Sequence, residues 1–187
     1  MLVETHAIGE VRKNNHNNQL AFFANRDFFA GETIAVFGAR ETLSSPTYLT
    51  VQISDTQHIL LDPAHLQFIN HSCDPNCFFD TTSMEVIALR AINNGEEMTF
   101  FYPATEWDMS QTFSCNCKTP QCLGNIRGGK HLSQEEANRY RLNEYILAKR
   151  NTTLLPKSRS RRSHKTKKRL AIKKAMLEKK SLRRKGK

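Results

Sequence analysis

The chain has 187 residues, of which 28 are lysine or arginine and 18 are aspartate or glutamate, so its formal net charge at pH 7 is +10. That total conceals two unlike parts, because residues 157–187 hold 16 of the basic residues and one acid, which leaves residues 1–156 with a net charge of −5. No apolar run approaches the ~18 residues that span a bilayer, and residues 1–5 lack the basic and apolar regions of a secretory signal. A body of this length suits one domain.

Short β-prone runs fill most of the body. They are 21–24, 33–37, 48–53, 58–61, 85–89 and 98–102, and turn-forming residues such as those at 30–32 and 93–95 separate them. This pattern predicts a mostly β domain.

One clear helix is expected late in the chain. Ser133 and Glu136 have the spacing of a capping box, and Leu132 and Ala137 are placed for a hydrophobic staple, so the helix begins there and runs to about Lys149.

The basic tail, residues 157–187, contains no aromatic residue and little apolar surface, which predicts disorder in the free protein. The spacing of Ala171, Ala175, Glu178 and Leu182 favours a helix on a surface that neutralises the lysines. Such tails bind nucleic acid through counterion release or act as nuclear import signals. The alternative is a solubilising extension.

Five cysteines lie in two segments, with Cys115, Cys117 and Cys122 in one and Cys73 and Cys77 in the other. Structural zinc takes four ligands, usually thiolates, and the C-x-C-x4-C cluster offers three, so either Cys73 or Cys77 completes the site. A disulfide pair with a spare thiol is the alternative, but in a reducing compartment this spacing indicates metal first. A shared metal site brings residues 70–77 against the region after Tyr102.

Three motifs in order resemble the signatures of SET-domain protein-lysine methyltransferases with a post-SET zinc site. They are Asn70–Cys77 (NHSCDPNC), Gly95–Tyr102 (GEEMTFFY) and Cys115–Gly124, and the resemblance covers about residues 3–128. It implies a mostly β SET fold in which the Asn70 and Tyr102 segments thread past each other in a pseudoknot, an exception to un-knotted topology. The expected organisation is a SET domain at 1–110, a post-SET zinc segment at 111–130, a C-terminal helix at 131–156 and the disordered basic tail.

The resemblance also implies a cofactor, S-adenosylmethionine, and a role for each site residue. Tyr102 stands beside the methyl transfer, and Tyr48 in the strand 47–49 is the second tyrosine of the lysine channel. Phe100 tunes the channel width. Asn70 and His71 bind the cofactor, and Cys73 is the fourth zinc ligand. Phenylalanine at position 100 leaves room for higher methylation states. Cys77 is then a small buried hydrophobe. Core packing is the alternative role for Tyr48, Phe100 and, less readily, Tyr102.

The sequence departs from the family at the first cofactor-binding motif. A Gly-x-Gly should fall at residues 19–21, but Gln19 and Ala21 replace both glycines just before Phe23. We expect Ala21 and Phe23 to contact the cofactor here, and the Cβ of Ala21 is tolerated if its φ is negative.

These features predict a zinc-containing, S-adenosylmethionine-dependent protein-lysine N-methyltransferase that acts on a basic, histone or histone-like protein. The acidic body suits a lysine-rich substrate strand, and residues 157–187 suit DNA. The expected location is intracellular and reducing, in a nucleus or nucleoid, or in a host nucleus for a secreted bacterial effector; no feature indicates an oligomeric state. The alternative is a catalytically inactive SET-zinc module that binds DNA through its tail, which the missing glycines favour. A plain zinc-finger DNA binder leaves Asn70, His71 and Tyr102 unexplained.

Overall fold

The computed structural model describes residues 1–14, 18–154 and 171. Met1–Thr153 form one compact unit. The disorder and DNA binding predicted for residues 157–187 lie outside the described residues, as does all of the predicted tail helix except Ala171. Among the described helices, none is both long and apolar enough to cross a membrane.

Short strands contain most of the regular secondary structure of the unit, which confirms the mostly β prediction. The strands are β1 (Leu2–His6), β2 (Gly9–Lys13), β3 (Leu20–Ala24), β4 (Thr33–Val36), β5 (Gly38–Leu43), β6 (Thr50–Gln52), β7 (His58–Asp62), β8 (Asn70–His71), β9 (Cys77–Asp80), β10 (Glu85–Ala88), β11 (Thr99–Phe100), β12 (Phe113–Ser114) and β13 (Asn125–Ile126). Between Met1 and Leu154 the described helices are three 3-10 turns and two α-helices. They are η1 (Ala64–Phe68), η2 (Tyr102–Ala104), η3 (Gly129–His131), α1 (Gln134–Arg139) and α2 (Glu144–Leu154).

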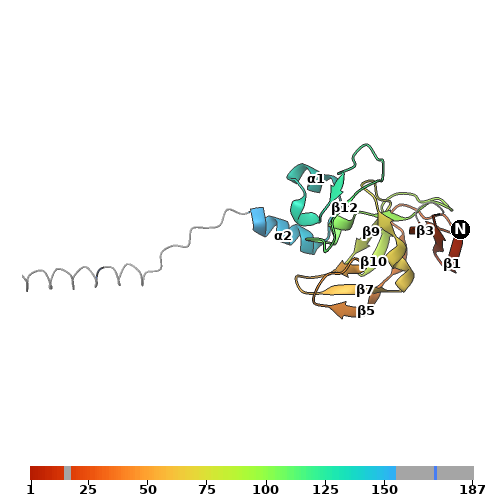
Figure 1. The fold of residues 1–187 in the computed structure, drawn as a ribbon, viewed down its shortest axis with the longest axis horizontal. Helices are drawn as coiled ribbons and strands as arrows, with labels where there is room; N and C mark the ends of the chain where they lie inside the picture. The colour runs from red at the N-terminus through yellow and green to blue at the C-terminus, as the bar shows by residue number, and fades with distance from the viewer. Residues whose placement is uncertain (15–17, 155–170, 172–187) are drawn as a thin grey trace, which may run out of the picture. The chain divides into compact units, whose positions relative to one another are not determined.

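The described strands form four small sheets, in the orders β1-β2-β3, β4-β10-β9-β11-β8, β5-β7-β6 and β12-β13. In the largest sheet β11 lies between β8 and β9 and runs parallel to both. The chain from β8 to β9 therefore passes around β11, as expected for segments that thread past each other. In Figure 1 the strands β1 and β3 lie at one end of the unit and α1 and α2 at the other, with β9 and β10 between them.

Two apolar clusters hold these layers together. The larger joins the sheets through fully buried side chains such as Val11, Phe22 and Phe79, each of which contributes about 1.5–3 kcal/mol when removed from water. The smaller packs the C-terminal helices on the strand ends through residues that include Phe101 and Ile146.

The predicted run 48–53 is strand only from Thr50 to Gln52. The hydroxyl of Thr50 accepts a hydrogen bond from the Thr47 backbone N–H at 2.9 Å and donates to the Thr47 carbonyl at 3.1 Å, which closes a turn. The prediction that Tyr48 lies in a strand is therefore wrong. Tyr48 lies in a turn and is 74% exposed.

The prediction of one helix across 131–156 is wrong, because the chain leaves the helix between α1 and α2. The capping box is present, with the Ser133 hydroxyl accepting from the Glu136 N–H at 3.1 Å and the Glu136 carboxylate accepting from the Ser133 N–H at 2.6 Å. The break is stabilised by Asn143, whose amide donates to the carbonyls of Phe79 and Ala104 at 2.8 and 2.9 Å. Satisfying these buried acceptors outweighs a continuous helix.

The second helix is fastened to the segment that precedes α1. The buried guanidinium of Arg150 donates to the carbonyl oxygens of Gly129, Leu132 and Ser133 at 2.6, 3.0 and 3.3 Å. The N–H of Gly129 in turn donates to the Glu106 carbonyl at 2.7 Å. Helix α2 is thus connected through η3 to the loop that follows Tyr102.

Candidate active site and metal centre

His71 links the Asn70 segment to the Tyr102 segment. Its Nδ1 accepts the backbone N–H of Tyr102 at 3.2 Å, and its Nε2 lies 3.4 Å from the Sγ of Cys73. Because Nδ1 is an acceptor, the ring proton belongs on Nε2 and points at the sulfur. Burial lowers the pKa of His71 to about 4, so the ring is neutral at pH 7.

Asn70 contributes a second link. Its side-chain amide donates to the carbonyl of Leu20 at 2.9 Å and lies 3.4 Å from a Glu97 carboxylate oxygen. The amide therefore ties β8 to β3, while the residue still faces the larger cavity described next.

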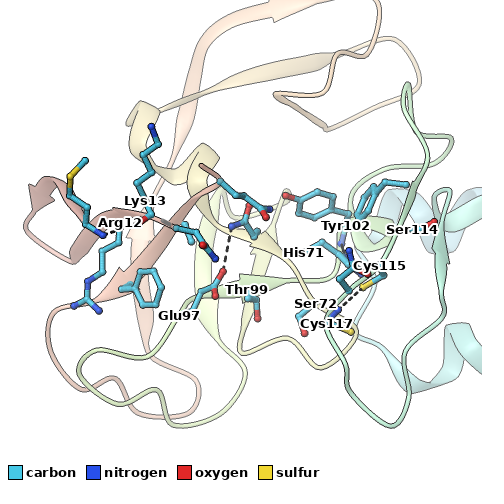
Figure 2. A pocket seen from close by; sticks show the side chains of 18 residues that line it. Arg12, Lys13, His71, Ser72, Glu97, Thr99, Tyr102, Ser114, Cys115 and Cys117 are labelled. Atoms are coloured by element: carbon cyan, nitrogen blue, oxygen red, sulfur yellow. Dashed lines mark hydrogen bonds between the residues drawn. The ribbon is translucent and has the colours of Figure 1, made fainter. Parts of the chain in front are cut away.

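A cavity of about 770 Å³ opens along these links (Figure 2). Arg12 and Lys13 lie at one end, Glu97 and Thr99 in the middle, and Tyr102 at the other end. This volume is within the range of small-molecule and cofactor sites, ~300–1,000 Å³. The predicted cofactor residues Ala21, Phe23, Asn70 and His71 all line it.

The residues that replace the two expected glycines do not fill this cavity. Gln19 and Ala21 both line it, and Ala21 is not among the described residues with positive φ. The backbone of β3 at this point is therefore ordinary strand that accepts a Cβ without strain.

A second, narrower cavity of about 180 Å³ shares Tyr102 with the first. Tyr48, Phe100 and Tyr102 line it together with apolar residues that include Leu66 and Ile69. Its size is too small for a cofactor and suits one extended side chain.

Tyr102 lines both cavities, as does Phe113. The Tyr102 ring packs on Phe100 at 4.6 Å and meets His71 edge-on at 5.2 Å between centroids. Burial, with a smaller effect from the Glu97 carboxylate, raises the pKa of Tyr102 to about 12, so the phenol keeps its proton at neutral pH. Its hydroxyl can donate a hydrogen bond at the junction of the cavities.

The structure brings four of the five cysteines together. The Sγ atoms of Cys73, Cys115, Cys117 and Cys122 all lie within 4.8 Å of one another, and those of Cys73 and Cys115 are 3.9 Å apart. Four thiolates around one zinc, each at ~2.3 Å, are ~3.8 Å apart, so the spacing fits that ion.

The surroundings of the thiols also fit a metal. Backbone N–H groups of Cys117 and Leu123 lie 3.4 Å from the sulfurs of Cys115 and Cys73, the arrangement that supports metal-bound thiolates. Burial and then the neighbouring thiols raise the pKa of Cys73, so its thiolate needs a nearby cation. Cys77 is apart from this group, fully buried, and directs its thiol to the Asn76 oxygen at 3.4 Å.

Sequence reasoning missed two buried polar residues. Asn76 is 1% exposed, donates to Glu96 and to the Glu97 carbonyl, and accepts from the Thr99 N–H at 2.8 Å, which holds the β8–β9 loop around β11. A second asparagine six residues after Asn70 was the available signal.

Glu106 is the other missed residue, and it lies in the wall of the narrow cavity. It is 8% exposed, and its Oε1 accepts the backbone N–H of Gln52 at 2.8 Å. Burial raises its pKa to about 7. The position four residues after Tyr102 gave no signal, because the partner is 54 residues away in the sequence.

Comparison with known proteins identifies part of the chain. Residues 41–103 match the family model of the SET domain. This range contains Tyr48, Asn70, His71, Phe100 and Tyr102.

Several relatives are named as methyltransferases. Over 117 residues the chain is 40% identical to methyltransferase flvH of Aspergillus flavus, which covers 60% of this chain and 65% of that protein. Over 120 residues it is 32% identical to histone-lysine N-methyltransferase ash1 of Drosophila melanogaster, covering 54% of this chain and 5% of that protein. Over 70 residues it is 40% identical to the H3 lysine-36 specific histone-lysine N-methyltransferase of Candida albicans, covering 34% and 8%. The chain thus spans just under two thirds of the first relative and a small part of the others.

We predict that the folded protein binds one zinc ion per chain through Cys73, Cys115, Cys117 and Cys122. Cys117→Ser should lose the metal and the order of residues 111–130, because metal binding contributes folding free energy. Elemental analysis of the purified variants measures the zinc content directly, with Cys77→Ser as the control that keeps its zinc. Loss of zinc from Cys77→Ser but not from Cys73→Ser would show that the ligand set is wrong.

A second prediction concerns the stability cost of the Glu106 charge. Its folded pKa is raised from 4.5 to about 7, so its contribution to stability is fullest below pH 4.5 and is lost as the pH rises through 7. Glu106→Gln keeps the oxygen that accepts from Gln52 and removes the charge. The unfolding free energy of the variant minus that of wild type should therefore increase by about 1–3 kcal/mol as the pH rises from 5 to 8.5. Urea unfolding at both pH values tests this, and Glu85→Gln, which changes a carboxylate on β10, should show no such gain.

Proposed function

This chain carries a SET domain, and on that premise we propose that it is an S-adenosylmethionine-dependent protein-lysine N-methyltransferase that acts on a basic protein. The observation that carries the proposal is that Tyr102 lines both the large and the narrow cavity. A methyl donor in one cavity and a substrate side chain in the other would meet at Tyr102. Among the described lining residues, only Phe113 shares this position.

The large cavity is the proposed cofactor site. Arg12 and Lys13 at one end suit a carboxylate, while Phe23 and Phe113 offer apolar faces to a ring. When bound, S-adenosylmethionine supplies a methyl group on a positively charged sulfur. The Tyr102 end of the cavity is where that group would face the narrow cavity.

The narrow cavity is the proposed lysine channel. Methyl transfer needs a neutral amine, although lysine has an unperturbed pKa of ~10.4. The apolar lining would lower that pKa by removing water, and the Tyr102 hydroxyl would hold the nitrogen where the narrow cavity meets the large one. Phe100, which also packs on Phe79 at 4.4 Å, leaves space that another hydroxyl would fill and so favours higher methylation states. Tyr48 stands at the exposed side of the channel.

The proposed zinc site organises the segment that closes this channel. Cys115 and Cys117 line the large cavity, and the neighbouring Phe113 lines both cavities. Zinc would supply a fixed positive charge that holds four thiolates together, and residues 111–130 would then act as a post-SET segment.

The proposed substrate is a histone or histone-like protein, and the proposed location is the nucleus. Two relatives are named as histone-lysine methyltransferases, and the net charge of −5 on residues 1–156 favours a lysine-rich strand. Nothing in the comparisons supports the effector alternative. We propose that residues 157–187 bind DNA, on the ground of their 16 basic residues.

The inactive SET-zinc module predicts that no cofactor binds. Against it stand the open cavity of about 770 Å³ and the ordinary backbone at Ala21. Calorimetric titration with S-adenosylmethionine distinguishes the two functions, because the proposed enzyme binds the cofactor and the inactive module does not.

Replacing Tyr102 with phenylalanine tests the catalytic proposal. Tyr102→Phe should keep the fold and the cofactor affinity but lower methyl transfer by about 100-fold or more, because it removes one hydroxyl from a site that works by positioning. The assay incubates labelled cofactor with a panel of basic proteins and locates methyl groups by mass spectrometry. Wild-type rates in the variant would remove Tyr102 from the mechanism, and no methylated lysine with any protein would refute the proposed activity.

Removing the basic tail tests its proposed role in delivery. Truncation after Pro156 should leave methylation of a short free peptide unchanged or faster, since a tethered basic strand competes for the acidic body at ~millimolar local concentration. Activity on DNA-bound substrate should fall, and the difference should fade as salt rises. Equal activity on DNA-bound and free substrate proteins, with no methyl groups on the intact tail, would favour the solubilising extension.

A further inference from the structure

The narrow cavity is lined by Glu106, whose carboxylate has no role in the methyl transfer as described above. The turn that presents Tyr102 also places Glu106, because the Glu106 N–H donates to the Tyr102 carbonyl at 3.0 Å. Both side chains line the same cavity, and Glu106 is 8% exposed. A buried carboxylate in an apolar channel is costly unless something cationic meets it.

One oxygen of this carboxylate is committed and the other is not. Oε1 accepts from the Gln52 N–H at 2.8 Å and lies 3.5 Å from the Thr105 hydroxyl. Oε2 has no hydrogen-bond partner within the described residues. This oxygen is not fully buried, and Glu106 lines the narrow cavity. A substrate side chain that enters this cavity would therefore meet a residue with one carboxylate oxygen still unpaired.

No cation within the described structure is bonded to Glu106. From α2, Lys149 pairs with Asp55, and Arg150 binds the Gly129 and Leu132 carbonyls. From β7, His58 lies opposite Gln52, and burial lowers its pKa. These groups lie around the hydrogen bond between Gln52 and Glu106, but none of them forms an ion pair with the carboxylate.

The other titratable groups of the cavity lining cannot take up a proton as Glu106 can. Of the described lining residues, only Tyr48, Tyr102 and Glu106 are titratable. The phenol of Tyr102 already holds its proton at neutral pH, since its pKa is raised to about 12. Tyr48 is 74% exposed to water. Burial, by contrast, raises the pKa of Glu106 to about 7, near the value that favours a proton acceptor at neutral pH.

We propose that Glu106 receives the ammonium group of the substrate lysine and accepts its proton, leaving a neutral amine beside Tyr102. The N–H bond breaks with its electron pair staying on nitrogen, and the proton forms an O–H bond on Oε2, so an ammonium and a carboxylate become an amine and a carboxylic acid. Desolvation favours this transfer from both sides, because it lowers the pKa of a lysine and raises that of a carboxyl. The proton returns to water when the channel opens. This inference rests on the proposed function and adds the residue that prepares the nucleophile.

The test compares wild type with Glu106→Gln across pH 6–10, using the basic protein that wild type methylates best. Glutamine keeps the acceptor for Gln52 but cannot take up the proton. At pH 7 kcat should fall about 100-fold or more. In wild type kcat should level off above neutral pH, whereas in the variant it should rise tenfold per pH unit until the pKa of the bound lysine is reached, which desolvation sets below the ordinary ~10.4. The two rates should therefore converge as the pH reaches that value.

Controls separate this role from a structural one. Glu85→Gln should match wild type at every pH, and Glu106→Asp, which keeps a carboxylate, should retain the plateau at a lower rate. A uniform loss of rate at all pH values in Glu106→Gln, or no loss, would overturn the proton-acceptor role while leaving lysine methylation intact. If Glu106→Gln does not fold, the wild-type profile decides, because a tenfold rise per unit with no plateau contradicts the role. A wild type that methylates no lysine at all would instead refute the proposed function, and this inference with it.

Discussion

The fixed tautomer of His71 is the constraint on which the two cavities and the cysteine cluster depend. One ring nitrogen accepts from the Tyr102 backbone and the other faces the Cys73 sulfur, so a single side chain sets the distance between Tyr102 and the cluster. Both roles need a neutral ring, and burial provides it. Loss of the ring would leave the buried N–H of Tyr102 without a partner, at a cost of about 1–3 kcal/mol.

Much of the centre of the fold was predictable because its residues carry chemistry as well as structure. The run from Asn70 to Cys77 combines amide, imidazole and thiol groups at fixed spacing, and the structure uses nearly all of them to hold β8 and β9 around β11. The six predicted β-prone runs correspond to β3, β4, β6, β7, β10 and β11, since buried apolar residues form these strands.

The remaining elements depend on contacts that sequence pattern does not encode. Strands β1 and β5 are largely exposed, and backbone pairing with neighbours makes them strands. The break between α1 and α2 follows from Asn143 reaching two distant carbonyls. Tyr140, just after α1, stacks on Phe101 at 3.7 Å and donates to the Cys73 carbonyl at 3.1 Å. The Gln52–Glu106 bond likewise joins residues that only the fold brings together.

The three hydrogen bonds from Arg150 to backbone carbonyls make the stability of the folded unit depend on a residue near its C-terminal end. The guanidinium satisfies the acceptors of Gly129, Leu132 and Ser133, and Gly129 supports the backbone of Glu106. A protease cut before this arginine would therefore remove the guanidinium donor of the buried Gly129 carbonyl, at a cost of about 1–3 kcal/mol, and that of the half-buried Leu132 carbonyl. The folded body therefore depends on a side chain about fifty residues beyond Tyr102, even though no described residue of α2 lines either cavity.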